Sequence, residues 1–137
     1  MDVLSTKQRS RNMAAIKGRN TKPEILVRRM LHAQGFRFRL HRKDLPGRPD
    51  IVLPRYKTVV FVNGCFWHQH AGCKFATKPS SRTEFWEAKL GRNVARDCEN
   101  AAKLAELGWR VVVVWECELR DADAVITRLV SSLTLSV

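Results

Sequence analysis

The sequence predicts an α/β sandwich built around a mixed β-sheet. Three observations support this class: the order of the predicted helices and strands, the strict alternation of residues 36–41, and the apolar run WRVVVVW at 109–115, in which Arg110 is the one charged residue. Alternation is typical of a strand with one face on the core, and a continuous apolar run is typical of a strand covered on both faces. Helices are therefore expected on both sides of one sheet.

The chain carries a large excess of positive charge. Lys and Arg number 25 against 13 Asp and Glu, which gives a formal net charge of +12 at pH 7. Such a surplus attracts polyanions, so nucleic acid is the expected partner, although basic surfaces also serve acidic membranes or solubility. No apolar run approaches a membrane span, and the polar N-terminus lacks the apolar region of a secretory signal. We expect a cytoplasmic protein with no membrane association.

The first 20 residues form a separate basic segment. Residues 5–17 have the composition of a short helix that Gly18 ends, and its few apolar positions include Met13 and Ile16. One interpretation is a frayed leader, and the other is an arm that orders on DNA with Met13 and Ile16 presented together. We assign residues 1–20 to such a DNA-clamping arm and residues 21–137 to a single domain.

A capping box opens the first helix of the domain. Thr21 stands three positions before Glu24, with Pro23 in the first turn, and the apolar pattern continues to Gly35. Glu24 thus has a sufficient structural role as a capping residue. Residues 36–41 then alternate between apolar and basic side chains, which predicts a strand whose basic face meets solvent or phosphates.

Two short apolar strands follow, and a carboxylate begins the first of them. Pro49 and Asp50 precede the apolar residues 51–53, and residues 58–62 form the next strand after a turn. Asp50 and the peptide around Val62 can therefore lie near each other on adjacent strands. A plain turn role for Asp50 is an equally good interpretation of its position after a proline.

A long helix and a final helix complete the predicted sandwich. Ser81 and Glu84 have capping-box spacing, and Gly108 ends the helical pattern that begins there. Asp97 lies beside the inward stripe, where a carboxylate needs a partner such as histidine, whereas a shift of one position would put it on the surface. Asp121 is predicted to cap the last helix. The predicted inward positions of the long helix are Val94, Cys98, Ala101, Ala102, Ala105 and Leu107.

Residues 61–73, FVNGCFWHQHAGC, contain the densest cluster of metal-binding residue types. Cys65, His70 and Cys73 have a C-x4-H-x2-C spacing that lets two thiolates and an imidazole converge on one tetrahedral ion. Cys117 is a candidate fourth ligand. We favour structural zinc over disulfides because no export signal is evident. His68 is left over, although a C-x2-H-x4-C set would use it in place of His70.

Three polar residues are predicted to converge on one place. Phosphodiester cleavage needs a hard cation to neutralise the charge that grows on the phosphate, and a base that takes a proton from water. Asp50 suits the first task and His68 the second, while Asp97 would hold the His68 ring in one tautomer. This combination favours a phosphodiester hydrolase.

Large aromatic side chains lie near the predicted zinc ligands. Phe66 and Trp67 follow a glycine, which favours a loop tip, and Trp86 stands at the start of the long helix. Flat apolar groups can wedge between base pairs when new stacking offsets the cost of unstacking them. A core position for Trp86 is the alternative, and we assign Trp109 and Trp115 to the core.

Five segments of the chain carry a resemblance to a known family. They are RSRNMAAIKGRNTKPE, LPGRPDIVLP, VVFVNGCFWHQHAGC, RTEFWEAKLGRNVARD and ELGWRVVVVWECELR, which run in order from Arg9 to about Arg120. Together they resemble the very short patch repair (Vsr) DNA mismatch endonuclease family. The resemblance implies a restriction-endonuclease-like α/β/α fold of the PD-(D/E)XK superfamily with a central mixed sheet. It also implies a Mg²⁺-dependent, strand-specific endonuclease that nicks DNA 5′ of the thymine in T·G mismatches left by deamination of 5-methylcytosine.

The resemblance also implies roles for individual residues. Asp50 and the backbone carbonyl of Val62 would hold Mg²⁺. His68 would activate water with Asp97 behind it, and Glu24 would lie at the edge of the site. The implied structural zinc ligands are Cys65, His70, Cys73 and Cys117, and the implied DNA-intercalating residues are Phe66, Trp67 and Trp86 with Met13 and Ile16 of the arm.

The implied partner is double-stranded DNA with a T·G mismatch, bound by a monomer in the bacterial nucleoid, with mismatch-repair proteins as further partners. Val62 and Asn63 depart from the family pattern, which has Thr-His at these positions. A main-chain carbonyl ligand survives the change at 62, but Asn63 cannot shuttle a proton. The alternatives are therefore a restriction-like nicking endonuclease without mismatch preference and a non-catalytic, zinc-stabilised protein that binds distorted DNA.

Overall fold

The computed structural model describes residues 21–134. The helices are α2 (Lys22–Ala33), α3 (Thr83–Glu106) and α4 (Ala122–Thr134), and the strands are β1 (Arg39–Leu40), β2 (Ile51–Leu53), β3 (Thr58–Asn63) and β4 (Arg110–Trp115). Short 3-10 helices span Pro54–Tyr56, Lys74–Ala76 and Glu116–Asp121. The predicted arm, with Met13 and Ile16, lies outside the described residues. Within residues 21–134, no helix has both the length and the apolar character needed to cross a membrane.

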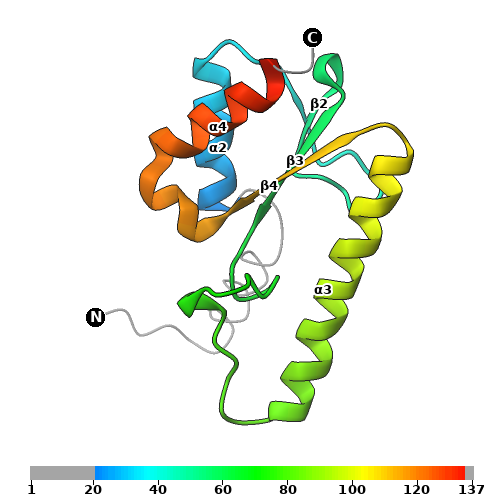
Figure 1. Ribbon diagram of the computed structural model, residues 1–137, viewed down its shortest axis with the longest axis vertical. Coiled ribbons are helices and arrows are strands. Elements are labelled where there is room, and N and C mark those ends of the chain that lie inside the picture. Colours follow the sequence, from blue (N-terminus) through cyan, green and yellow to red (C-terminus); the bar gives the residue numbers. More distant parts are fainter. Residues whose placement is uncertain (1–20, 135–137) are drawn as a thin grey trace, which may run out of the picture.

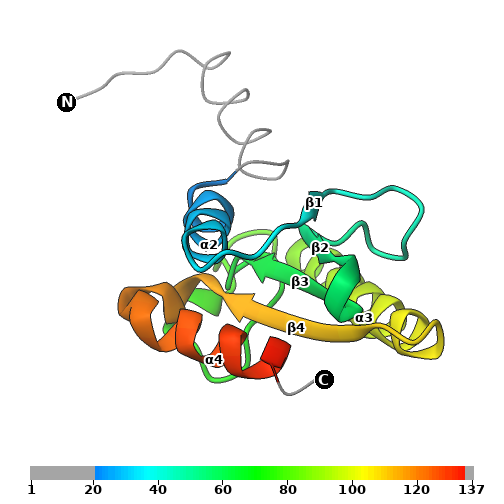
Figure 2. The same ribbon diagram turned by 90° about the horizontal axis from the view of Figure 1, so that it is seen from above.

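The strands form one mixed sheet between two helical layers. Their order is β1-β2-β3-β4, in which β2 pairs antiparallel with β1 and β3, and β3 pairs parallel with β4. Helices α2 and α4 lie together on one face of the sheet and α3 lies on the other (Figures 1 and 2). This arrangement confirms the predicted three-layer α/β/α architecture with a central mixed sheet.

Each face of the sheet has its own apolar core. The larger core joins the sheet to α2 and α4 through Val27, Leu31, Phe36, Ile51, Leu53, Val60, Val114, Val125, Leu129 and Leu133. The smaller one joins the sheet to α3 through Leu45, Val52, Val59, Leu104 and Trp109. Alternate residues of β2 and β3 supply the two cores, as the twofold period of a strand requires. The sheet is therefore packed on both faces, and the ends of β2 and β3 can hold functional groups in fixed positions.

The caps predicted at two helix starts are present. Thr21 Oγ1 accepts a hydrogen bond from the backbone N–H of Glu24 at 3.4 Å, and Asp121 Oδ1 accepts one from Ala124 N–H at 3.1 Å. Glu24 does more than cap, because its side chain is 3 % exposed and contacts Arg28 and His41. The structural role predicted for Glu24 is thus incomplete.

Several predicted boundaries differ from the observed ones. The strand predicted over 36–41 is reduced to Arg39–Leu40, because Phe36 N–H closes the end of α2 on Leu31 O and His41 ends the strand with φ of 49°. Helix α3 begins after Arg82, whose φ is 53° and whose side chain makes no capping bond, so the predicted Ser81 capping box is absent. Strand β4 ends the strand order of the described sheet, whereas its apolar run favoured a central position.

The inward stripe of α3 is also not the predicted one. The buried or half-buried positions of α3 are Trp86, Lys89, Leu90, Asn93, Asp97, Asn100, Ala101 and Leu104. Ala101 is thus half-buried as predicted, whereas the predicted inward residues Val94, Cys98, Ala102, Ala105 and Leu107 are exposed. The apolar pattern of the sequence failed here because the middle of α3 faces a cleft and not a core. Asp97 therefore points inward, as predicted, with polar neighbours along the same stripe.

Candidate functional site

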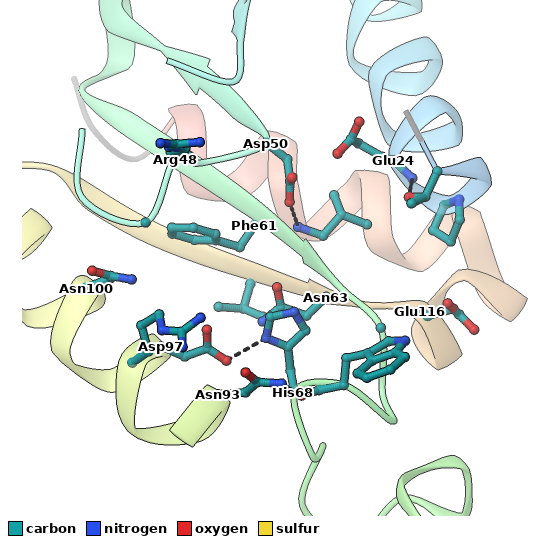
Figure 3. Close-up of a pocket in the computed structure, with 18 of the residues that line it drawn as sticks. Glu24, Arg48, Asp50, Phe61, Asn63, His68, Asn93, Asp97, Asn100 and Glu116 are labelled. Carbon is teal, nitrogen blue, oxygen red and sulfur yellow. Dashed lines mark hydrogen bonds and ion pairs between the residues drawn. The ribbon is translucent and has the colours of Figure 1, made fainter. Parts of the chain in front are cut away.

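A cleft of about 1080 Å³ lies between the start of α2, the end of β3 and the middle of α3. Figure 3 shows Glu24 and Asp50 on one side of this cleft and His68 and Asp97 on the other, with β3 running between them. The side chains that line it come from every layer of the fold. They include Glu24, Arg48, Asp50, Val62, Asn63, Trp67, His68, Lys89, Asn93, Arg96, Asp97, Asn100 and Glu116.

Asp50 enters the cleft from the residue before β2. Its Oδ2 accepts a hydrogen bond from the backbone N–H of Val62 at 2.7 Å, which ties the carboxylate to the neighbouring strand. Burial is the largest influence on this group and raises its pKa from 3.8 to about 8, and the adjacent Glu24 adds to the increase. Two carboxylates in so little solvent are a favourable place for a divalent cation, which would relieve both effects.

The loop before Asp50 fits closely against α3. Gly47 has φ of 77°, and a β-carbon there would lie 3.0 Å from Cβ of Asn100. Only glycine satisfies both the left-handed backbone and this close approach. Gly47 thus fixes the path of the loop that places Asp50.

The raised pKa of Asp50 predicts how stability depends on pH. The folded state holds the Asp50 proton up to about pH 8, whereas the unfolded chain releases it near its ordinary value of 3.8. The stabilising contribution is therefore complete below pH 3.8 and is lost as pH rises toward about 8. Without added Mg²⁺, urea denaturation should show the parent losing stability over this range relative to Asp50→Asn. A constant difference between the two proteins at all pH values would contradict this prediction.

The structure brings His68 and Asp97 together. Their Nδ1 and Oδ2 atoms are 2.6 Å apart, and the side chains are 31 % and 37 % exposed. The backbone N–H of His68 donates to Gly64 O at 3.1 Å, which anchors the loop after β3. With Nδ1 engaged by Asp97, the Nε2 atom is the ring nitrogen left to act on a ligand in the cleft.

His41 is a residue of this cleft region that the sequence analysis did not single out. Its Nε2 lies 3.2 Å from both carboxylate oxygens of Glu24, and the possible ligand atoms of Glu24, His41 and Asp50 all lie within 4.8 Å of one another. The register of β1 on β2 brings His41 to Asp50, because Leu40 faces Ile51 and the next pair along is His41 and Asp50. That register depends on the length and conformation of the connection, which the sequence pattern does not specify.

The structure places His70, and not His68, among the cysteines. The possible ligand atoms of Cys65, His70, Cys73 and Cys117 all lie within 4.8 Å of one another, and His70 Nδ1 is 3.8 Å from Cys65 Sγ and 3.4 Å from Cys117 Sγ. Burial raises the pKa of the Cys65 thiol to about 12, so a thiolate there requires a cation beside it. Three sulfurs and one imidazole nitrogen at this spacing fit tetrahedral zinc. The four ligands would join the loop after β3 to Cys117, which lies in the 3-10 helix Glu116–Asp121 that follows β4.

The aromatic residues near the cleft form one group. The ring centroids of Phe66 and Trp67 are 5.0 Å apart, those of Phe66 and Trp86 are 5.6 Å apart, and those of Trp67 and Trp86 are 6.0 Å apart. All three are half-buried and belong to neither apolar core. Asn93 of α3 donates from Nδ2 to the Trp67 carbonyl at 3.1 Å, which fixes this group relative to the cleft.

Comparisons with known proteins agree with this architecture. The family model described as DNA mismatch endonuclease Vsr matches residues 1–74. The chain is 52 % identical over 128 residues to the type II nicking enzyme V.XorIIP of Xanthomonas oryzae pv. oryzae, covering 93 % of each protein. It is 49 % identical over 122 residues to the DNA mismatch endonuclease Vsr of Escherichia coli K12, covering 89 % of this chain and 78 % of that protein.

A solved structure shares the fold. The catalytic domain of the homing endonuclease I-Bth0305I superposes with a TM-score of 0.62 at 21 % identity, covering 86 % of this chain and 99 % of that domain. This likeness supports the restriction-endonuclease-like fold expected from the sequence. On the strength of the family match and the two relatives, the chain belongs to the Vsr DNA mismatch endonuclease family.

Proposed function

We propose that this protein is a Mg²⁺-dependent DNA endonuclease that nicks one strand 5′ of the thymine in a T·G mismatch left by deamination of 5-methylcytosine. Membership of the Vsr family supports the coarser part of this statement, a nicking DNA endonuclease. The observation that carries the mechanism is that Asp50 and the His68–Asp97 pair line one cleft. In the proposed mechanism, Asp50 and His68 would act on a single phosphate of DNA from the two sides of this cleft.

Asp50 and the backbone carbonyl of Val62 would hold the Mg²⁺ ion, with Glu24 at its edge. The residues present fit this ion, because two poorly solvated carboxylates favour a hard divalent cation and Val62 lies beside Asp50. When bound, the ion neutralises the charge that grows on the phosphate during hydrolysis.

His68 would take the proton of the attacking water through Nε2. Asp97 holds Nδ1 at 2.6 Å, so it orients the ring and stabilises the protonated form that appears as the proton arrives. Asn63, buried at 7 % exposure, lines the cleft where an amide can donate a hydrogen bond but cannot carry a proton. Proton transfer in this chain therefore rests on His68.

Replacing His68 with alanine should lower the single-turnover nicking rate by roughly 10²–10⁴-fold, the usual worth of a general base. Asp97→Asn should cause a smaller loss, because the ring remains but loses its charged partner. Duplex binding should change little in either variant. His32→Ala, an exposed change on α2, is the matched control. A nicking rate that is unchanged in His68→Ala would rule out the assigned role.

The aromatic group would enter the base stack at the mismatch. Phe66, Trp67 and Trp86 present half-buried rings beside the cleft, and a net charge of +12 favours the DNA backbone around them. The arm of residues 1–20, with Met13 and Ile16, would close on the DNA groove opposite the one that the aromatic group enters. A structural zinc on Cys65, His70, Cys73 and Cys117 would hold the aromatic loop in place.

Trp67→Ala should weaken binding to a T·G duplex by about five- to a hundredfold, because stacking of one base on an aromatic ring is worth about 1–3 kcal/mol. Fluorescence anisotropy with matched T·G and T·A duplexes measures this effect. Phe75→Ala removes a ring that is 51 % exposed and outside the aromatic group, so it should leave binding unchanged. An equal loss of affinity in Trp67→Ala and Phe75→Ala would refute the proposed insertion of Trp67 into the base stack.

The proposal is tested by incubating the protein and Mg²⁺ with a duplex that carries one T·G pair within the sequence that the cognate cytosine methyltransferase modifies. The same duplex with a T·A pair at that position is the comparison. We expect one nick, on the thymine strand, in the T·G duplex only. Equal cutting of both duplexes would favour a restriction-like nicking enzyme without mismatch preference. Binding to the T·G duplex without a nick would favour a non-catalytic distortion-binding protein.

A further inference from the structure

We infer that His41 joins Glu24 and Asp50 in a mixed imidazole and carboxylate cation site that binds Mn²⁺ more tightly than Mg²⁺. The inference deepens the proposed function and rests on it for the role of the site in DNA cleavage. It concerns a residue that the resemblance to the family does not assign. The evidence is the position, contacts and chemistry of His41.

The fold brings His41 to Asp50 from across the sheet. Strand β1 pairs antiparallel with β2, with Arg39 facing Val52 and Leu40 facing Ile51, so His41 faces Asp50 at the end of the pairing. The backbone N–H of His41 donates to Asp50 O at 3.4 Å. His41 then leaves the strand with φ of 49°, a left-handed conformation that few non-glycine residues adopt. The backbone at His41 is therefore coupled directly to the residue that carries the proposed metal ligand.

The side chain of His41 is as far from Glu24 and Asp50 as two ligands of one metal ion are from each other. Its Nε2 atom is 3.2 Å from both Glu24 carboxylate oxygens, and the possible ligand atoms of Glu24, His41 and Asp50 all lie within 4.8 Å of one another. Adjacent ligands of a six-coordinate ion with bonds near 2.1 Å lie about 3 Å apart. The three side chains thus have the spacing of ligands on one ion.

Burial and charge also favour a cation at this place. The side chain of His41 is 13 % exposed and that of Glu24 is 3 % exposed, and the nearby Arg28 pairs with Glu24. Glu24 and Asp50 are two carboxylates beside the guanidinium of Arg28, and burial, with a further contribution from Glu24, raises the pKa of Asp50. A divalent ion supplies the missing positive charge, and a neutral imidazole can then serve as its ligand.

The imidazole determines which ion the site prefers. Mg²⁺ is a hard ion that selects oxygen ligands, whereas first-row transition ions accept imidazole nitrogen readily. Two carboxylates alone would give little discrimination between Mg²⁺ and Mn²⁺. With His41 as a nitrogen ligand, the site should bind Mn²⁺ about tenfold more tightly than Mg²⁺.

Electron spin resonance of Mn²⁺ bound to the zinc-loaded, DNA-free protein tests this inference. Spin-echo modulation from a directly bound nitrogen should be present in the parent and in His68→Gln, and absent in His41→Gln. Competition between the two ions should show the Mn²⁺ preference falling about tenfold in His41→Gln, with Mg²⁺ affinity nearly unchanged. His32→Gln is the control for an exposed histidine outside the cluster.

Labelling the parent with ¹⁵N-histidine provides the same information without substitution at 41, in case His41→Gln folds poorly. The modulation should shift to the ¹⁵N frequency, and it should do so in His68→Gln as well. Absence of nitrogen modulation in the parent, or its loss in His68→Gln alone, would overturn the inference. A protein with this nitrogen signal that does not nick T·G duplexes would overturn the proposed function and leave the cation site standing.

Discussion

Replacing Asp50 with asparagine is expected to lower the rate of nicking of T·G duplexes about a thousandfold while leaving duplex binding intact. Asp50 immediately precedes β2, and its carboxylate accepts a hydrogen bond from the backbone N–H of Val62 on the neighbouring strand β3. Burial raises its pKa, which indicates a poorly solvated place that suits a divalent cation. Stabilisation of phosphate charge by such a cation is worth several kcal/mol, so the expected loss of rate is about a thousandfold. Asparagine keeps the shape of the side chain, and its amide removes the charge on which the ion depends.

Single-turnover nicking with saturating enzyme measures the Asp50 effect separately from binding. Asp44→Asn is the matched control, because Asp44 belongs to the same connection, is 62 % exposed and pairs with Arg42 outside the cleft. It should nick at the parental rate. If Asp50→Asn and the parent nick equally fast, the metal assignment fails. If Asp50→Asn also loses DNA binding, the variant has lost more than the metal ligand.

Replacing Cys117 with alanine is expected to release zinc and unfold the protein. Cys65, His70 and Cys73 lie in the loop after β3, and Cys117 follows the parallel neighbour β4, so the four ligands would staple two segments that are far apart in sequence. Structural zinc contributes on the order of 10 kcal/mol in small domains, whereas the net stability of a whole domain is about 5–15 kcal/mol. The loss of one ligand is therefore comparable to the entire stability of the fold.

Zinc content by atomic absorption and unfolding by circular dichroism measure the two parts of this prediction. Cys98→Ala is the matched control, because Cys98 is exposed on α3 and outside the cysteine cluster. It should retain one zinc and the parental unfolding temperature. A folded Cys117→Ala protein with the parental zinc content would show that these residues do not hold the metal.

The sequence predicted those parts of the molecule that local patterns specify. The capping residue Thr21 and the cap Asp121 depend on hydrogen bonds within one turn, and both are present. The spacing of Cys65, His70 and Cys73 limits how these ligands can meet, and the structure gathers them with Cys117. The three-layer arrangement followed from the order of the helices and strands.

Features that depend on contacts between distant parts of the chain could not be predicted from the sequence pattern. The inward stripe of α3 is polar at Asn93, Asp97 and Asn100 because it faces a cleft, and hydrophobic periodicity cannot reveal a face that has no core opposite it. The sequence pattern did not predict that His41 lies near Asp50, because this proximity depends on the register of β1 on β2, which a pattern of alternating residues does not determine. The place of β4 at the end of the described strand order likewise depends on pairing and not on composition.

A crystal structure of the protein on a T·G duplex, with Ca²⁺ in place of Mg²⁺ to prevent cleavage, tests most directly whether the two sides of the cleft act on one bond. We expect the ion on Asp50 and Nε2 of His68 to approach the same phosphate, the one 5′ of the mispaired thymine, with Asp97 still on Nδ1. A complex in which these groups contact different phosphates, or in which His68 binds the zinc, would contradict the hydrolytic mechanism.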